Sequence, residues 1–188
     1  MSGQIEELAR RMAAGDQEAF DRLMEIFYTR ALRMAYLISG NYADSQDIVQ
    51  ETFVILYVNR KKIKEPRYFE RWLIRTLTRE AWRVCRRRSR EQPAEEVFQK
   101  GEPAGPSVLE EVMEGMEDRE LYQAVLNLPP KQRTAVVLYY FDGMSTKEIG
   151  AVMGCLEGTV KSRLFTARAC LRRALTRERE TCKKEAAL

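Results

Sequence analysis

Arginine side chains are concentrated in residues 67–90, where they recur at steps of three and four residues and so share one side of a helix. Guanidinium groups bind phosphates and neighbouring aromatic rings stack on bases, a combination that suits single-stranded nucleic acid. Trp82 lies off the apolar stripe of this helix and is the better stacking candidate; we expect Phe69 and Trp72, which share the stripe, in the core. A merely solvated basic face is the alternative. The arginines in register are Arg67, Arg71, Arg75, Arg79, Arg83 and Arg86.

A second candidate for nucleic-acid binding is the segment 145–168, which has the pattern of a helix-turn-helix. Ser145 and Glu148 form a capping-box pattern, Gly154 ends the short helix that follows, and a second helix begins near Gly158. Cations, hydroxyls and an aromatic ring on its outer side suit the major groove, although a helical hairpin with a solvated basic face is the alternative. These outer residues are Thr159, Lys161, Ser162, Arg163, Phe165, Thr166 and Arg168.

A third set of polar residues, Asp44, Asp47, Gln50 and Glu51, shares one face of another predicted helix. Paired carboxylates suggest acid–base chemistry, but no nucleophile, metal partner or phosphate loop accompanies them, so a protein-docking face is the more economical interpretation. The chain has no histidine, which excludes serine–histidine and cysteine–histidine catalysis and histidine metal sites. We therefore expect a protein that is not an enzyme, with no catalytic residue, no metal, no cofactor and no small-molecule substrate.

The distribution of charge predicts two domains. The 188 residues carry a formal net charge of only +4. Residues 1–90 carry +6, residues 91–118 carry −8, and residues 119–188 carry +6. The acidic segment also holds Pro93, Pro103, Gly105 and Pro106, which is typical of a linker. We predict a domain over residues 1–92, a flexible acidic linker over 93–117, and a second domain with a basic tail over 118–188.

Apolar periodicity predicts an all-α fold of two small helical domains. In the first, one long helix ends at Gly40, a second runs from near Asp44 to about Asn59, and a third follows Pro66. In the second, helices are expected from Ser107 to about Leu126, from Lys131 to about Phe141, from Ser145 to Gly154, and from Gly158 to about Leu175.

The cellular compartment is predicted to be the cytoplasm. The longest apolar run, residues 135–141, is far shorter than the ~18 residues of a membrane helix, and the N-terminus has no signal-peptide pattern. The four cysteines lack CxxC spacing and are expected to be reduced thiols.

These motifs together resemble the extracytoplasmic-function (ECF) group of bacterial RNA polymerase sigma factors, in the sigma-70 superfamily. Residues 44–53, DSQDIVQETF, resemble the family's segment that binds core polymerase. Residues 128–133, LPPKQR, together with 140–150 and the string GTVKSRL at 158–164, resemble its fourth conserved region. The resemblance covers nearly the whole chain apart from the linker and the tail.

The resemblance implies a role for each site. Asp44, Asp47, Gln50 and Glu51 would dock on core RNA polymerase. The residues implied at the minus-ten promoter element, which the third helix would read and help to melt, are Arg71, Arg75, Arg79, Trp82, Arg83 and Arg86. Those implied at the minus-thirty-five element of promoter DNA are Thr159, Lys161, Ser162, Arg163, Phe165 and Thr166.

The resemblance also implies control by an anti-sigma factor, but it does not give the promoter sequence. The linker would follow the RNA-exit path, and a membrane-linked anti-sigma factor would hold both domains until a signal arrives. Arg79 stands where the family usually has asparagine and Thr166 where it often has arginine, so the preferred promoter sequence is not transferable. The alternative function is a helix-turn-helix regulator that does not bind polymerase; a helical adaptor for acidic partners is a third.

Overall fold

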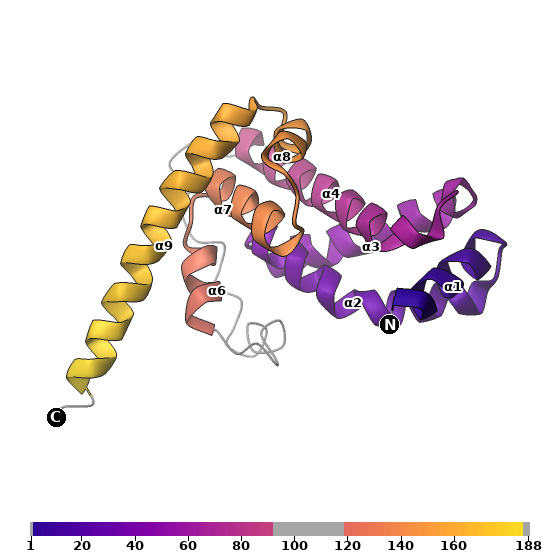
Figure 1. Cartoon of the computed structure of the whole chain (residues 1–188), viewed down its shortest axis with the longest axis horizontal. Coiled ribbons are helices and arrows are strands. Elements are labelled where there is room, and N and C mark those ends of the chain that lie inside the picture. Colours follow the sequence, from indigo (N-terminus) through magenta and orange to yellow (C-terminus); the bar gives the residue numbers. More distant parts are fainter. Residues whose placement is uncertain (1, 92–118, 186–188) are drawn as a thin grey trace.

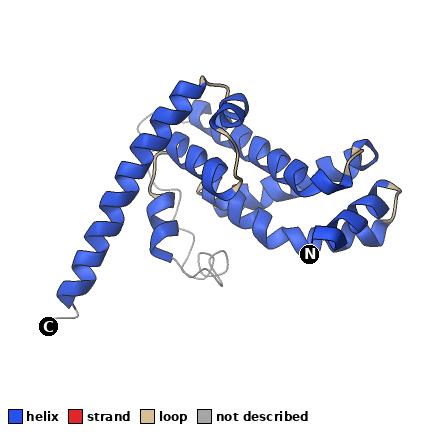
Figure 2. Ribbon diagram, viewed as in Figure 1, coloured by secondary structure: helices blue, strands red, loops and turns tan. Residues whose placement is uncertain are grey.

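The computed structural model describes residues 2–91 and 119–185, all of whose regular elements are helical (Figure 2). The first group contains α1 (Ser2–Ala13), α2 (Gln17–Ser39), α3 (Tyr42–Asn59), the short turns η1 (Arg60–Lys62) and η2 (Pro66–Tyr68), and α4 (Phe69–Glu91). The second contains α6 (Arg119–Leu126), α7 (Pro130–Val136), the π-helical turn η3 (Val137–Phe141), α8 (Thr146–Met153) and α9 (Glu157–Glu185). The all-α fold predicted from periodicity is confirmed.

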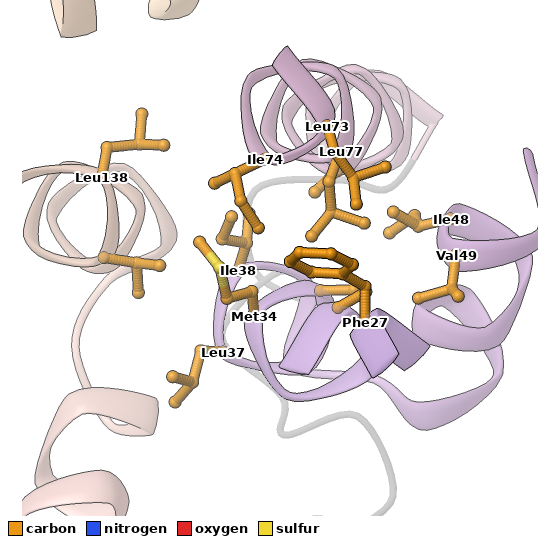
Figure 3. Packing of buried hydrophobic residues seen from close by; sticks show 14 of the residues in the cluster. Phe27, Met34, Leu37, Ile38, Ile48, Val49, Leu73, Ile74, Leu77 and Leu138 are labelled. Carbon is orange, nitrogen blue, oxygen red and sulfur yellow. The ribbon is translucent and has the colours of Figure 1, made fainter. Parts of the chain in front are cut away.

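The long helix α2 is the centre of the first group. Asp16 caps its start by accepting a hydrogen bond from the Ala19 amide, and Gly40 ends it with a φ of 70°, a left-handed conformation that favours glycine. Its apolar stripe, which includes Phe27 and Ile38, packs against α3 and α4 (Figure 3). The predicted end of this helix at Gly40 is confirmed.

Several helix boundaries differ from those predicted. Helix α3 begins at Tyr42, two residues before Asp44, because the Asn41 side chain accepts a hydrogen bond from the Asp44 amide and acts as the cap. Helix α9 extends to Glu185, well past Leu175. The start of the helix expected at Ser107 and the predicted linker lie outside the described residues.

Helix α1 was not predicted, although Ile5, Leu8, Ala9 and Met12 recur at helical spacing. Its buried side, Leu8, Ala9 and Met12, joins the same core as α2. A helix this short is stabilised mostly by such packing, so its local sequence carries only a weak helical signal.

The two groups of helices are in contact with each other. Helices α6, α7 and η3 pack against α2, and α8 packs against α4 (Figure 1). Leu138 of η3 lies on the side of α2 that carries Met34 and Leu37, and all three belong to one continuous apolar cluster (Figure 3). The arginine-rich helix α4 and the helix-turn-helix therefore belong to one assembly of packed helices.

Candidate polymerase and nucleic-acid interfaces

The acidic residues of α3 lie on its outer side because the opposite side is buried. Ile48, Val49, Phe53 and Leu56 face the core, and the Thr52 hydroxyl donates to the Ile48 carbonyl at 2.7 Å. The outer side is formed by residues that we call the α3 face: Asp47, Gln50, Glu51, Val54 and Val58.

Two members of the α3 face were missed by sequence reasoning. Val54 is 55% exposed and Val58 is 67% exposed, and both lie one turn apart beyond the acidic residues. Exposed valines next to carboxylates and an amide form a mixed surface of the kind that binds another protein. The available signal was that Val54 and Val58 fall outside the stripe of Ile48, Val49, Phe53 and Leu56.

Asp44 differs from the rest of the predicted docking residues. Its carboxylate accepts a hydrogen bond of 2.8 Å from the Arg88 guanidinium of α4, and both side chains are half-buried. Asp44 thus joins α3 to α4, while Asp47, Gln50 and Glu51 remain exposed.

The arginines of α4 are positioned by the buried side of that helix. Phe69, Leu73, Ile74, Leu77 and Ala81 lie in the core, so most arginines of α4 are turned away from it, whereas Arg75 is half-buried. Arg79 and Arg86 are exposed, and Arg83 donates to Glu80 one turn before it at 2.8 Å.

Two of the α4 arginines contact the second group of helices. Arg71 donates to the Glu148 carboxylate of α8 at 2.8 Å, and Arg75 donates to the same oxygen. The structure thus brings two residues predicted at the minus-ten element into contact with the helix-turn-helix, an arrangement that helical periodicity does not predict.

Trp82 is only partly exposed. It packs against the apolar cluster, and its indole N–H is buried with no hydrogen-bond partner among the described residues. Trp72 also packs partly buried against the cluster, and Phe69 is fully buried, as expected for members of the apolar stripe. The role of Trp82 as a stacking residue stays a prediction.

The helix-turn-helix has the local structure that its sequence predicts. The Ser145 hydroxyl accepts from the Glu148 amide and the Glu148 carboxylate accepts from the Ser145 amide, which completes the capping box. Gly154 ends α8 with a φ of 63°. A Cβ on Gly150 would lie 2.8 Å from the Cys155 carbonyl oxygen. Only glycine at this position therefore allows the close approach of α8 to the turn that follows it.

The start of α9 carries the predicted major-groove residues. Val160, Leu164 and Ala167 are buried and fix the rotation of the helix. The exposed residues are Thr159, Lys161, Ser162, Phe165 and Thr166, which we call the recognition face. Phe165 is 75% exposed, a large apolar side chain held in solvent.

Arg163 departs from the rest of its predicted set because it is half-buried. One of its guanidinium nitrogens lies 3.3 Å from the Cys155 sulfur and 3.8 Å from that of Met153. Arg168, in contrast, is exposed and donates to the Tyr140 hydroxyl at 2.7 Å. Contact of Arg163 with DNA stays a prediction.

Neighbouring groups favour the ionised forms of two carboxylates in the helix-turn-helix, those of Glu148 and Glu157. Hydrogen bonds from the Ser145 amide and hydroxyl, with Arg75 and Arg71 nearby, lower the pKa of Glu148 to about 2. Lys161 and the Thr146 hydroxyl lower the pKa of Glu157. Within residues 2–91 and 119–185, no cluster of metal-ligating side chains occurs and none of the helices is long and apolar enough to cross a bilayer.

Comparisons with known proteins identify families and relatives that match both groups of helices. Residues 23–91 match the family described as Sigma-70 region 2, and residues 118–171 match Sigma-70, region 4. The ECF RNA polymerase sigma factor SigW of Bacillus subtilis is 31% identical over 189 residues, which cover 93% of this chain and 98% of that protein. The ECF RNA polymerase sigma-E factor of Escherichia coli is 31% identical over 178 residues, covering 87% and 90%.

Solved structures show the same fold. The sigma factor RpoE from Bartonella quintana, in complex with the anti-sigma factor NepR, matches with a TM-score of 0.57 and 26% identity, covering 84% of this chain and 96% of that one. CnrH in complex with the cytosolic domain of CnrY matches with a TM-score of 0.57 and 24% identity, covering 92% and 97%.

Proposed function

The chain belongs to the extracytoplasmic-function group of the sigma-70 family, and from this premise we propose how its three surfaces divide the work of starting transcription. As a sigma factor it directs bacterial core RNA polymerase to promoters. It binds core polymerase and promoter DNA.

The α3 face is the proposed docking site for core polymerase. Asp47, Gln50 and Glu51 supply charged and amide groups, and Val54 supplies apolar surface that a partner removes from water. Asp44 contributes to this surface mainly by holding α3 against α4 through Arg88.

The arginines of α4 and the recognition face are the proposed DNA sites. Cations at regular spacing along α4 suit the backbone of the minus-ten element, and Trp82 near its middle suits an unstacked base. On α9, Lys161 suits a guanine edge, Ser162 and Thr166 suit bases or phosphates, and Phe165 suits a thymine methyl in the major groove of the minus-thirty-five element.

The single observation that carries this assignment is the presence of the α3 face, the arginine helix and the helix-turn-helix on one chain. A helix-turn-helix regulator that never binds polymerase accounts for residues 145–168 and leaves the α3 face without a partner. The predicted domains, residues 1–92 and 118–188 with an acidic linker over 93–117, give each DNA element its own module and remain part of this proposal.

We further propose that the chain acts by binding alone, without catalysis, and in the cytoplasm where polymerase and promoters are found. Its control would come from an anti-sigma factor, linked to the membrane. The likeness to a sigma factor solved with its anti-sigma factor supports the control by such a partner.

Binding to core polymerase separates the sigma factor from an ordinary regulator. Purified chain is mixed with sigma-free core polymerase and passed through a size-exclusion column. Co-elution that is lost in the double variant Asp47→Ala, Gln50→Ala supports the proposal; a chain that does not co-elute with core polymerase contradicts it.

A further inference from the structure

Tyr140 is an exposed aromatic side chain outside both the core and the recognition face. It lies in η3, where the Asp142 amide donates to the Val137 carbonyl at 3.3 Å and makes the turn π-helical. Val137 and Leu138 of this turn are buried, whereas Tyr140 is 54% exposed. Because π-helical turns are rare and occur frequently at functional sites, the exposed ring calls for a role other than packing.

Tyr140 is joined to α9 through Arg168. Helix α7, which η3 continues, packs against α9 (Figure 1). The Arg168 Nε donates a hydrogen bond of 2.7 Å to the Tyr140 hydroxyl, and the guanidinium carbon lies 5.7 Å from the centre of the Tyr140 ring. The hydrogen bond and the cation–π contact together fix the orientation of the guanidinium.

This pair keeps donors in reserve. An arginine has five N–H donors, and the bond to Tyr140 occupies only the one on Nε. Because the Tyr140 oxygen accepts that bond, its own O–H points to another acceptor, and none of the described residues supplies one. Arg168 also has no carboxylate partner among the described residues, whereas Lys161 pairs with Glu157 at 2.8 Å. An anion with several oxygens can accept from the guanidinium and from the phenol at once.

The position of Arg168 on α9 indicates which anion that is. Lys161, Phe165 and Arg168 are four and three residues apart and all exposed, so they share one side of the helix. Tyr140 lies beside the last of them and extends this side beyond α9 itself. Since the second helix of a helix-turn-helix lies in the major groove, side chains at the margin of its DNA-facing side meet the phosphates that border the groove.

We propose that Tyr140 and Arg168 form a phosphate-binding pair that holds one DNA phosphate at the edge of the minus-thirty-five element. This inference rests on the proposed function of the recognition face. The terminal nitrogens of Arg168 supply charge, and the Tyr140 O–H supplies a second hydrogen bond to the same phosphate. Such a contact carries no sequence information; it sets the register of α9 in the groove, so that Lys161 and Phe165 meet their bases.

The test measures the contribution of single phosphates to binding. The full chain is assembled with sigma-free core polymerase and bound to a promoter duplex that this holoenzyme transcribes. In a series of duplexes, each phosphate in and around the minus-thirty-five element is replaced in turn by an uncharged methylphosphonate. Competition in fluorescence anisotropy gives the affinity for each duplex, and the loss at each position forms a phosphate profile.

Tyr140→Phe and Arg168→Ala should each weaken binding to the native duplex about three- to tenfold, as expected for loss of a hydrogen bond to a charged group. Both should also become insensitive to the methylphosphonate at one and the same position, while their profiles elsewhere match that of the unaltered chain. Arg168→Ala should reduce the slope of log affinity against log salt concentration by about one, because it removes a cation from a phosphate.

Tyr139→Phe is the matched control for the phenol. The Tyr139 ring centre lies 5.8 Å from the Arg168 guanidinium carbon, almost as close as that of Tyr140, but the hydrogen bond from Arg168 goes to Tyr140. This variant should keep both the affinity and the profile. Arg119→Ala, which removes an exposed arginine of α6 outside the helix-turn-helix, controls for loss of charge and should keep the profile as well.

An unchanged profile in Tyr140→Phe and Arg168→Ala would overturn the inference, because a pair that only attaches η3 to α9 changes the melting temperature without changing the loss at any single phosphate. Loss of sensitivity at two different positions would overturn it too, since the two side chains would then act separately. If Tyr140→Phe lowers the melting temperature, the exposed Arg168 still allows the comparison through Arg168→Ala.

Lys161→Ala separates this inference from the proposed function. Weaker promoter binding in Lys161→Ala, with unchanged profiles in the Tyr140 and Arg168 variants, overturns the phosphate-binding pair alone. Unchanged binding in all three variants removes the recognition face as a DNA site, and the inference with it.

Discussion

The Asp44 carboxylate of α3 accepts a 2.8 Å hydrogen bond from the guanidinium of Arg88 on α4. Its neighbour Asp47, less than one turn further along α3, is exposed. Two acidic residues of one sequence motif therefore face different surroundings, one joining two helices of the same chain and the other facing solvent.

This difference predicts separate effects for the two aspartates. Asp44→Ala should lower the free energy of unfolding by up to about 1 kcal/mol, as expected for a half-buried ion pair, with a smaller effect on core affinity. Asp47→Ala should leave unfolding unchanged and weaken binding to core polymerase. Urea denaturation and biolayer interferometry measure the two quantities; the reverse pattern would show that Asp44 is the docking residue.

The exposed valines of α3 predict an apolar contribution to docking. Val54→Ser and Val58→Ser should weaken core binding by about 1–2 kcal/mol each if polymerase buries these side chains. Because both are more than half exposed, the melting temperature should not fall. Val49→Ser is the matched control, since Val49 is buried and its loss should destabilise the fold. Unchanged affinity for both exposed variants would limit the docking surface to Asp47, Gln50 and Glu51.

Lys161 on the recognition face predicts a sequence-specific contact. If it reads a base, Lys161→Ala should cost about 1–3 kcal/mol on the cognate minus-thirty-five element and less on unrelated duplex DNA. Electrophoretic mobility shift at several salt concentrations distinguishes this from a phosphate contact. If affinity falls equally on both duplexes, and the slope of log affinity against log salt concentration is reduced by about one, Lys161 binds the DNA backbone.

The partly buried position of Trp82 changes how its stacking role must be tested. Trp82→Ala removes packing against the core as well as a stacking surface, so it confounds the two. Trp82→Leu keeps apolar volume without an aromatic ring and should slow promoter melting more than initial binding, whereas Trp82→Phe should keep both near the unaltered rate. 2-Aminopurine fluorescence in the minus-ten element follows melting. Equal effects of Trp82→Leu on binding and melting would argue against base stacking.

Burial between the two groups of helices raises the pKa of Asp142 to about 6, against the opposing effect of Arg75, Arg30 and Arg71 and with a small contribution from Glu148. The raised pKa means that the folded chain favours the protonated form of Asp142, so burial of this side chain destabilises the fold least at acid pH. The loss in the free energy of unfolding grows as the pH rises from about 4 to about 6 and is constant above that.

Asp142→Asn should accordingly be more stable than the unaltered chain at pH 7 and closer to it at pH 4. Urea midpoints of both proteins across this range give the difference directly. If the difference in urea midpoint between the two proteins is constant from pH 4 to pH 7, or becomes smaller toward pH 7, the burial of this carboxylate is contradicted.

Local features of the fold follow from local sequence signals. Ser145 and Glu148 predict the capping box, Gly40 and Gly154 predict helix ends, and the apolar stripes predict the buried sides of α2, α4 and α9. Each signal depends on residues three or four apart, which one turn of helix brings together.

The contacts between distant segments could not be predicted in this way. Arg75 and Glu148 are separated by 73 residues, and Arg133 and Ile38 by 95, so nothing in a local pattern indicates that they meet. The burial of Arg133 is the clearest case, because an arginine in a basic helix is ordinarily expected in solvent. The half-buried position of Arg163 comes from a nearer contact, with Cys155 and Met153, which lie 8 and 10 residues before it.

Run-off transcription tests the central claim most directly. The full chain is added to sigma-free core polymerase with a library of promoter fragments from a bacterium that encodes it, and transcripts are mapped at their 5′ ends. The account predicts transcripts from a defined subset of promoters. These transcripts should be lost with the double variant Asp47→Ala, Gln50→Ala, and should be weaker or come from other promoters with Lys161→Ala. Transcription no different from that of core polymerase alone would contradict it.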